Sequence, residues 1–515
     1  MMHPEIATVA FASVVVMLFV LDRDRNARTS KALWLPVIWI SIAASRAVSA
    51  WLDVIGFTNG APLMGSPDEG SPLDRNVTTA LLAMGIIVLF NRRRMVARLL
   101  RANGALLLFL LYGAISVLWS DYPDVAFKRW IRTQGSVVMI MIVLTDPDRL
   151  VAVKRFLTRP AFVLVPMSIL VINYYPNVGR YYDPWVWQPT VSGLTTNKNE
   201  LGMICMVFGL ASLYWFSSTY RERASTQRTR RLIAHAALLA MVFWLFRMAN
   251  SMTSQSCFLL AGSLIVATNH RLLVRRPRLA HLLVALVMSV ALSALFVESF
   301  GGVLKTIGRN STLTGRTEIW DLVLSLSGNP FFGTGFGSFW VGWRLEKIWS
   351  VYWFKPVQAH SGYLEMYLNL GLIGLALLAV VIIAGYRNVL AGFRLTPDAS
   401  RLKLAYLVTV VIYNATEAAF GGLMLTIFLL SVMVVPKTPV SKGPTRPESD
   451  HIDWPGGSVD PGVLPAVVPP GYNHEHHQYR LDPDETGQRS PWTSPAIRVE
   501  SAELKQEYVL ETIVI

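Results

Sequence analysis

The stretch Q-A-H-S-G-Y-L-E-M-Y-L-N-L-G-L-I-G-L-A-L-L-A-V-V-I-I-A-G, residues 358–385, decides the fold class of this chain. After Glu365 it contains no further charged residue. A helix needs roughly 20 predominantly apolar residues to cross the hydrocarbon core of a bilayer. We therefore predict that this segment spans a membrane.

Similar apolar runs recur along the 515 residues, of which 53% are hydrophobic and only 16% are charged. Soluble proteins carry about 25% charged residues. The predicted fold class is an all-α integral membrane protein with about 12–13 transmembrane helices. The first run lacks a basic n-region and a small-residue cleavage site, so we interpret it as a retained helix. The predicted spans are 5–21, 32–51, 77–91, 104–119, 133–145, 161–175, 199–217, 232–250, 254–269, 281–297, 363–385, 404–419 and 420–435.

Basic residues are concentrated in every second loop between these runs. Such loops face the cytoplasm by the positive-inside rule, which places the amino terminus outside and the carboxyl terminus inside. The net charge of +14 therefore reflects membrane topology and does not indicate a nucleic-acid partner. We predict a multi-pass membrane protein. The basic loops lie at 23–31, 92–101, 149–159, 221–231, 271–278 and 387–403.

The remaining loops are predicted to be external, and the segment 298–362 is much the largest of them. It is rich in Trp and Phe, and such a composition is unlike that of disordered chains. The resulting organisation has four parts. They are N-terminal transmembrane helices with external loops (1–297), the large periplasmic loop (298–362), C-terminal transmembrane helices (363–435) and a disordered cytoplasmic tail (436–515).

Three external segments contain polar residues that could carry chemistry. The first is G-R-Y-Y-D-P-W-V-W-Q-P-T-V-S-G-L-T-T-N-K-N-E-L-G, residues 179–202, with Arg180, Lys198 and Asn199 as candidates for substrate binding. The alternative is that Tyr, Trp and Lys side chains only anchor this segment at the membrane interface.

The second segment is T-G-R-T-E-I-W-D-L-V-L-S-L-S-G-N-P-F-F-G-T-G-F-G-S-F-W, residues 314–340. No strand precedes its G-T-G-F-G and no Lys-Ser/Thr pair follows, so we interpret these glycines as a turn and not as a nucleotide loop. The planar guanidinium of Arg316 suits diphosphate oxygens. The alternative role for Arg316 is an ion pair with Glu318 or Asp321.

The third segment is Q-A-H-S-G-Y-L-E-M-Y-L-N-L-G-L-I-G-L, residues 358–375, in which His360 is the candidate catalytic base. Ser361, Glu365 and Asn369 follow at intervals of four residues and form one polar stripe, with Tyr363 near its start. We include Tyr363 and Glu365 among the candidates for substrate binding. Polar stripes in membranes usually face a bundle interior or a wet cavity. A purely interfacial role for His360 is the alternative.

Further polar residues fall inside predicted spans. Arg46, Arg247, Asn414 and Glu417 are the main ones, and Asn414 and Glu417 are i, i+3 neighbours on one helix face. Intramembrane charges often mark substrate pathways, so we include the last three among the candidates for substrate binding. Packing between helices is the alternative for each of them.

These segments resemble the motifs of the bacterial O-antigen ligase and O-antigen/exopolysaccharide polymerase family. The motifs are G-L-T-T-N-K-N-E-L-G, G-R-T-E-I-W with N-P-F-F-G-T-G-F-G-S-F-W, and A-H-S-G-Y-L-E-M-Y-L-N-L-G-L-I-G. S-M-T-S-Q-S and Y-N-A-T-E-A are similar to weaker blocks, and the resemblance covers roughly residues 30–435. Many members have A-H-N where this chain has Ala359-His360-Ser361.

The resemblance implies a metal-independent, inverting glycosyl transfer at the outer, periplasmic face of a bacterial inner membrane, with no cofactor and no metal. The implied donor is a glycan on undecaprenyl diphosphate, and the implied acceptor is a lipid-A core or a growing polysaccharide, with a polymerase slightly favoured over a ligase. The family's arginines and histidine map onto Arg180, Arg316 and His360. The lipid bilayer and a polysaccharide assembly or export machinery are the other implied partners.

Two rival functions remain open from the sequence. A lipid-linked glycan flippase or other transporter would also need polar groups inside the bundle, but not the aromatic loop between Arg316 and His360. A metal-dependent transferase of polyprenyl-monophosphate sugars would use an acidic pair in an early external loop. Asp22-Arg23-Asp24 fits that pattern but is predicted to be cytoplasmic.

Overall fold

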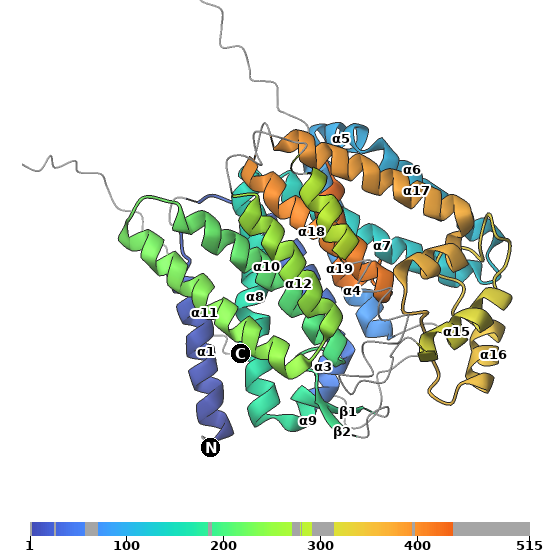
Figure 1. The fold of residues 1–515 in the computed structure, drawn as a ribbon, viewed down its shortest axis with the longest axis horizontal. Coiled ribbons are helices and arrows are strands. Elements are labelled where there is room, and N and C mark those ends of the chain that lie inside the picture. The colour runs from blue at the N-terminus through green and yellow to red at the C-terminus, as the bar shows by residue number, and fades with distance from the viewer. Residues whose placement is uncertain are drawn as a thin grey trace, which may run out of the picture. The chain divides into compact units, whose positions relative to one another are not determined.

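The computed structural model describes residues 3–24, 27–56, 71–183, 188–269, 279, 281–290, 314–393 and 397–435, and the statements below concern these residues. Residues 1–439 form one compact unit, whose ribbon is shown in Figure 1. The predicted tail, 436–515, lies outside the described residues, as do the predicted loop residues 298–313.

The described part of the chain is built almost entirely of helices, with one short hairpin of the antiparallel strands β1 (Arg180–Asp183) and β2 (Gln188–Val191). The helices of the first half are α1 (Pro4–Leu21), η1 (Lys31–Leu33), α2 (Trp34–Ala43), α3 (Val48–Val54), α4 (Pro72–Asn91), α5 (Arg93–Ala102), α6 (Gly104–Ile115), η2 (Ser116–Trp119), α7 (Pro123–Leu144), α8 (Arg149–Tyr174) and α9 (Pro176–Gly179). The later helices are α10 (Lys198–Tyr220), α11 (Thr226–Ala249), α12 (Met252–Ala267), an apolar helix His281–Val290, α15 (Thr314–Ser325), α16 (Trp343–Val351), α17 (Gly362–Gly392), α18 (Pro397–Thr416) and α19 (Gly422–Val432).

Each of the thirteen predicted ranges contains a described helix. Among the described residues, six helices are long and apolar enough to cross a membrane: α1, α4, α8, α10, α11 and α17. Two bent pairs pass the same test, namely η1–α2 with α3 (67°) and α5 with α6–η2 (90°). The all-α membrane fold is confirmed, whereas the number of helices that cross the bilayer stays a prediction.

The outer surface of the bundle is apolar in the way that a lipid-facing surface requires. On α1, Val9 is 68% exposed, and on α4, Ile87 and Phe90 are 64% and 68% exposed. Contiguous apolar patches of this kind are rare on soluble monomers. The polar faces that would make these helices amphipathic are missing, and the chain is therefore an integral membrane protein.

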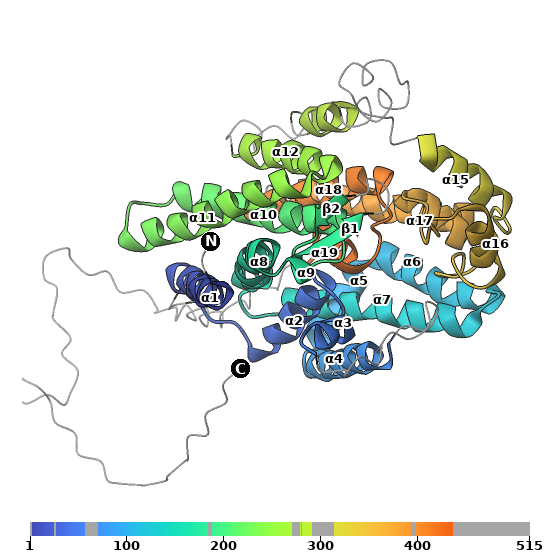
Figure 2. The same cartoon turned by 90° about the horizontal axis from the view of Figure 1, so that it is seen from below.

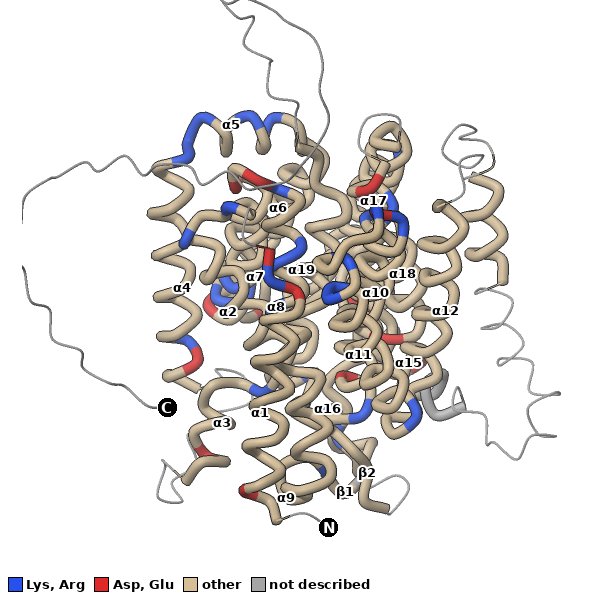
Figure 3. The backbone as a smooth tube through the Cα atoms, turned by 90° about the vertical axis from the view of Figure 1, so that its left-hand side faces the viewer, with Lys and Arg blue, Asp and Glu red and all other residues tan. Residues whose placement is uncertain are grey.

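The two ends of the bundle differ, and Figure 3 shows the cations of α5 at the end opposite to the amino terminus and the β1–β2 hairpin. We call these ends the hairpin side and the α5 side. On the hairpin side, the hydroxyl of Tyr175 at the end of α8 lies 2.8 Å from that of Thr8 near the start of α1.

On the α5 side, the loops that the sequence marked as basic come together. Arg92 donates to the carbonyl of Ile142 (3.1 Å) and to the hydroxyl of Ser30 (2.7 Å). Ser30 in turn donates to Asp146, at 2.6 Å from its hydroxyl. The loops following α1, α4 and α7 therefore share one end of the bundle, as predicted. That this end is cytoplasmic remains a prediction of the positive-inside rule.

The core of the bundle surrounds α10, which lies between α11 and α18 when seen from below (Figure 2). Tyr406 of α18 is fully buried there and donates its hydroxyl to the carbonyl of Val207 at 2.9 Å. In this position the hydroxyl is satisfied by a backbone group, which an apolar interior requires.

Helix α17 is broken inside the predicted span. Gly371 has φ 64° and ψ −165°, a backbone conformation that is essentially confined to glycine. In a continuous helix each carbonyl accepts a hydrogen bond from the N–H group four residues later. The break interrupts this ladder, and the freed groups need other partners because lipid offers none.

The segment 329–339 supplies most of these partners. The freed N–H groups of Leu372 and Ile373 donate to the carbonyls of Pro330 (2.9 Å) and Phe331 (3.2 Å). In the other direction, Thr334 donates from its N–H and its hydroxyl to the Leu368 carbonyl, at 3.1 and 3.0 Å.

Two further hydrogen bonds satisfy carbonyls on the amino-terminal side of the break. We call this whole set of hydrogen bonds the seal. The N–H of Gly335 donates to the carbonyl of Asn369 at 2.9 Å, and the hydroxyl of Tyr112 on α6 donates to the carbonyl of Leu370 at 3.0 Å. The G-T-G-F-G glycines do form turns, since Gly333 and Gly335 have positive φ. The sequence did not indicate that these turns dock into a broken helix.

The described remainder of the large loop forms a small hydrophobic core beside α17. Three residues are fully buried there against Leu368 of α17. They are Val323 of α15, Ile348 of α16, and Phe339 in the segment before α16. The aromatic residues of the loop are thus packed around an interior of their own, and this core positions α15 and α16 on the hairpin side.

We expect Gly371→Ala to destabilise the protein strongly. The strained conformation alone costs about 1–3 kcal/mol for a residue with a Cβ, and that Cβ would overlap the backbone of Phe331. The thermal midpoint of the purified protein, followed by tryptophan fluorescence, measures the effect. Gly104→Ala is the matched control, because a Cβ at Gly104 meets no atom within 4 Å; equal midpoints for the two variants would refute the role of the break.

Candidate functional site

His360 stands on the hairpin side, in the turn that leads from α16 into α17. Its φ is +52°, which is uncommon for a residue with a side chain. The preceding residue, Ala359, is held from both sides. Its N–H donates to the Glu365 carboxylate at 2.6 Å, and its carbonyl accepts from the indole of Trp320 on α15 at 2.8 Å.

Glu417 is the acidic partner of His360. Its Oε2 lies 3.7 Å from Nδ1 of the imidazole, and the two side chains are 12% and 32% exposed. That distance is an electrostatic contact and exceeds hydrogen-bond length. The Nδ1 atom is buried and forms no hydrogen bond. Hydrogen bonds in catalytic sites are often long before substrate binds, so this pair has the arrangement of a base and the group that orients it.

The position of Glu417 follows from how α18 ends. The helix stops at Thr416, and Glu417 begins the turn towards α19. Asn414 is fully buried and stabilises this turn. Its amide donates to the Val410 carbonyl at 2.9 Å, and its oxygen accepts from the N–H of Ala419 at 3.0 Å. The sequence predicts Asn414 as a substrate-binding residue, whereas these contacts favour a positioning role.

Tyr363 and Gly362 connect the two turns. The Tyr363 hydroxyl donates to the carbonyl of Val411 at 2.8 Å, and the Gly362 N–H donates to the carbonyl of Glu417 at 3.1 Å. A Cβ at Gly362 would overlap the side chain of Asn414. Tyr363, another substrate-binding candidate, is thereby engaged in fixing the start of α17 against α18.

The polar stripe of α17 faces the 329–339 segment. Both carboxylate oxygens of Glu365 lie 2.8 Å from the indole nitrogen of Trp340, and Asn369 accepts from the N–H of Phe339 at 3.1 Å. Glu365 and Asn369 also line a cavity of about 240 Å³, together with Arg129 of α7. The stripe therefore borders a cavity, as its spacing predicted, while Glu365 holds the turn before His360.

The start of α10 is a capped helix terminus on the same side. The Asn197 side chain accepts from the N–H groups of Asn199 and Glu200, both at 3.0 Å, and Glu200 accepts from the hydroxyl of Thr196 at 2.7 Å. These bonds explain the polarity of the N-K-N sequence by helix capping. Lys198 and Asn199 lie in the first turn, where they remain candidates for contact with an anion.

Other charged residues extend this polar region. The buried ring of Tyr413 on α18 lies within electrostatic reach of both Glu200 and Glu417, which brings the start of α10 near the His360–Glu417 pair. Arg46 donates to the carbonyls of Thr195 (3.1 Å) and Val178 (2.6 Å). Arg46 is therefore a structural clamp on the loop before α10.

The predicted arginines have different surroundings. Arg180 and Arg247 are exposed on the hairpin side, and Arg180 donates from Nε to the Ile172 carbonyl at 3.0 Å. The side chain of Arg316 lies outside the described residues, although its backbone belongs to α15. The structure therefore brings together His360, Glu417 and Glu365, and leaves the convergence of Arg316 with them as a prediction.

Arg129 and Trp340 line the cavity but were not among the candidates. Arg129 donates to the carbonyl of Gly337 at 2.5 Å and thereby ties α7 to the 329–339 segment. The sequence K-R-W-I-R at 128–132 could have indicated Arg129, since it places three cations in a loop that is predicted to be external. We missed it because the predicted span began only at residue 133, after these cations.

Two comparisons with known proteins match parts of this chain. Residues 239–379 match the family model described as O-antigen ligase. The match contains Arg247, the 329–339 segment, His360 and the break in α17. The chain is also similar to the exopolysaccharide production protein ExoQ of Rhizobium meliloti (strain 1021), at 23% identity over 292 residues.

That similarity covers 54% of this chain and 63% of the relative, which is less than two thirds of the relative's length. The two findings confirm the resemblance to the O-antigen ligase and polymerase family that the motifs indicated. Both matches are named for surface polysaccharides, O-antigen in the first case and exopolysaccharide in the second.

We expect Asn414→Leu to lower the thermal midpoint, because the N–H of Ala419 loses its acceptor. A buried donor without a partner costs about 1–3 kcal/mol. Asn173→Leu is the matched control, since Asn173 also donates to the carbonyl four residues earlier but is exposed. A midpoint that falls equally in both variants would show that the bond to Ala419 contributes nothing.

Proposed function

We propose that this protein transfers a glycan from an undecaprenyl-diphosphate-linked donor to a glycan acceptor. The reaction would take place on the hairpin side, at the outer face of a bacterial inner membrane. The observation that carries the proposal is the His360–Glu417 pair, held in place by α15, α17 and α18. His360 lies within the residues that match the O-antigen ligase family.

In the proposed reaction, an acceptor hydroxyl attacks the anomeric carbon of the donor glycan. The new glycosidic bond forms while the bond from that carbon to the diphosphate oxygen breaks, and the configuration is inverted. The hydroxyl proton passes to Nε2 of His360, and the lipid diphosphate leaves as an anion. Histidine is the side chain that most often serves as a general base in enzymes.

Glu417 supports this step by its charge and by its position. A carboxylate beside Nδ1 favours the proton on that nitrogen, leaves Nε2 free to accept another proton, and stabilises the imidazolium that results. The positive φ of His360 is a cost that the fold sustains only where the surroundings fix it. Trp320, Glu365 and the turn at Glu417 provide that fixation.

Arg316 is proposed to stabilise the diphosphate leaving group. It precedes Trp320 by one helical turn in α15, and residues four apart share a helix face. Because Trp320 contacts Ala359, we expect position 316 to share the helix face that is directed to the turn of His360. A guanidinium is permanently charged and binds phosphate oxygens in a bidentate manner. Arg180 and Lys198 would assist at the hairpin-side surface.

The acceptor is proposed to be a growing carrier-linked polysaccharide, so that a polymerase is favoured over a ligase. The support is the printed name of the relative from Rhizobium meliloti, which concerns exopolysaccharide production. A lipid-A core as acceptor would make the protein a ligase acting on the same donor, with the same proposed base.

We expect His360→Ala to express and fold normally but to lower the rate of transfer by about 10²–10⁴-fold, the usual contribution of a general base. Glu417→Gln should reduce the rate less, and the double variant should be no worse than His360→Ala, because both residues act in one step. The assay follows product formation by reconstituted protein with a polyprenyl-diphosphate glycan.

His281→Ala provides the control for this set. His281 is exposed and bonds to Tyr386 at 2.9 Å, well outside the proposed site, so transfer should be unchanged. Product formation at the wild-type rate by folded His360→Ala would refute the base. Translocation of the donor without any product would instead identify a flippase.

We expect Arg316→Lys to raise the KM for the donor and lower kcat, because Lys keeps the charge but loses the planar fork. Arg94→Lys on α5 is the control, since Arg94 is exposed on the opposite side of the bundle. Unaltered kinetic constants in Arg316→Lys would exclude a bidentate diphosphate clamp at this position.

A further inference from the structure

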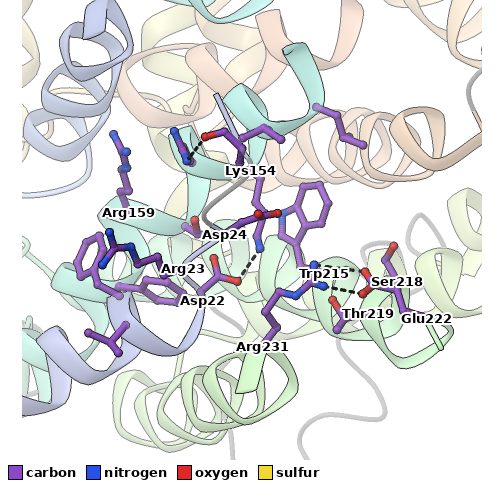
Figure 4. A pocket seen from close by; sticks show the side chains of 18 residues that line it. Asp22, Arg23, Asp24, Lys154, Arg159, Trp215, Ser218, Thr219, Glu222 and Arg231 are labelled. Carbon is purple, nitrogen blue, oxygen red and sulfur yellow. Dashed lines mark hydrogen bonds and ion pairs between the residues drawn. The ribbon is translucent and has the colours of Figure 1, made fainter. Parts of the chain in front are cut away.

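The α5 side holds a cavity of about 710 Å³ that the proposed transfer does not use. It lies between the end of α1, the start of α8, the end of α10 and the start of α11 (Figure 4). Because the start of α1 and the end of α8 meet on the hairpin side, this cavity is at the opposite end of the bundle from His360.

Cations outnumber carboxylates in the lining. Asp22, Asp24 and Glu222 are the three carboxylates, against five cationic side chains. Two of these cations are neutralised within the cavity: Lys154 by Asp22 at 2.5 Å and Arg231 by Glu222 at 2.8 Å, and Figure 4 shows both pairs. The cationic lining residues are Arg23, Lys154, Arg155, Arg159 and Arg231.

The pairing of Asp22 is stable at neutral pH. Burial raises the pKa of Asp22, but the nearby His235 and the hydrogen-bonded Lys154 outweigh burial, and its pKa lies below the ordinary value. The carboxylate is therefore ionised and remains paired with Lys154. Asp22 is not available to neutralise the arginines of α8.

Arg155 and Arg159 supply the excess positive charge. They stand one turn apart on α8, a spacing at which like charges repel each other. Arg155 donates to the hydroxyl of Thr29 (2.5 Å) and to the carbonyl of Ala27 (2.9 Å), which are neutral groups. Arg159 stacks over the ring of Trp34, 4.3 Å from its centroid, and pairs with no carboxylate in the described part of the chain.

The same cavity has an apolar wall. Phe19 of α1 and Phe162 of α8 pack edge to face, with ring centroids 5.6 Å apart, and both line the cavity with Val20 and Leu150. Helix α1 itself faces lipid, since only 11% of its residues are buried. One wall is thus continuous with the lipid-exposed surface, which a site for a soluble anion would not need.

We infer that this cavity binds the headgroup of an anionic membrane lipid, with its phosphate diester between Arg155 and Arg159 and its acyl chains along Phe19 and Phe162. Arginine forks bind phosphate oxygens in pairs, and basic pockets between transmembrane helices bind anionic headgroups on the cytoplasmic side. The inference is independent of the proposed glycan transfer, because no residue of the cavity belongs to the site at His360.

The experiment measures lipid binding to the full-length protein in a neutral detergent by native mass spectrometry and by the shift in thermal midpoint. The probes are phosphatidylglycerol, phosphatidylcholine, inorganic phosphate and pyrophosphate. We expect one phosphatidylglycerol to bind on the order of tenfold more tightly than phosphatidylcholine, since each nearby cation contributes about 1 kcal/mol towards an anionic lipid. Added salt should weaken this preference.

The variant Arg155→Gln/Arg159→Gln should lose the preference, while Arg155→Lys/Arg159→Lys should keep most of it. The control Arg94→Gln/Arg101→Gln removes two exposed cations of α5 on the same side and should retain wild-type binding. Each variant is compared with its own lipid-free midpoint, which separates a folding defect from a binding defect.

Several results would overturn the inference. Equal binding of the two lipids would do so, as would full phosphatidylglycerol binding by the glutamine variant. Saturable binding of phosphate or pyrophosphate without any lipid preference would assign the cavity to a soluble anion instead. A loss of preference in the α5 control as large as in the cavity variant would show that the preference arises from general surface charge.

Discussion

The rest of the structure depends on the break in α17 at Gly371 and on the backbone groups that seal it. A bilayer interior provides no water, so interrupting a helix there leaves N–H and C=O groups that must find partners in the protein. The 329–339 segment and Tyr112 provide them. The large loop is consequently joined to the transmembrane bundle by hydrogen bonds along its own backbone.

This seal determines the geometry of the candidate site. It holds Trp340 against Glu365, Glu365 holds the N–H of Ala359, and Trp320 holds the carbonyl of the same residue. His360 is the next residue, so its strained backbone is fixed by neighbours from three directions. On the facing helix, buried Asn414 shapes the turn that presents Glu417. Most of the polar groups around the histidine thus orient it, and few are left to contact a substrate directly.

The bundle places different chemistry at its two ends. The hairpin side combines an acid–histidine pair, a cavity beside it and capped helix termini, which suits a reaction on a large lipid-linked substrate. The α5 side gathers the basic loops, and between α1 and α8 it forms a second cavity with cationic and apolar walls. The substrate proposed for the hairpin side and the lipid proposed for the α5 side both carry phosphate, and the proposed proton transfer takes place on the hairpin side.

The sequence by itself determined the membrane fold, the places of the helices and the clustering of the basic loops, and it indicated the region around His360 as a candidate site. Each of these is encoded locally, by an apolar run, a run of charges or a motif. Only the tertiary structure decided that Glu417 pairs with His360, that the glycines at 333 and 335 seal a helix broken at 371, and that Arg129 joins the cavity. These contacts join residues that are far apart in the chain. No local pattern of polarity specifies which distant group will form a hydrogen bond with an N–H or C=O group freed by the break.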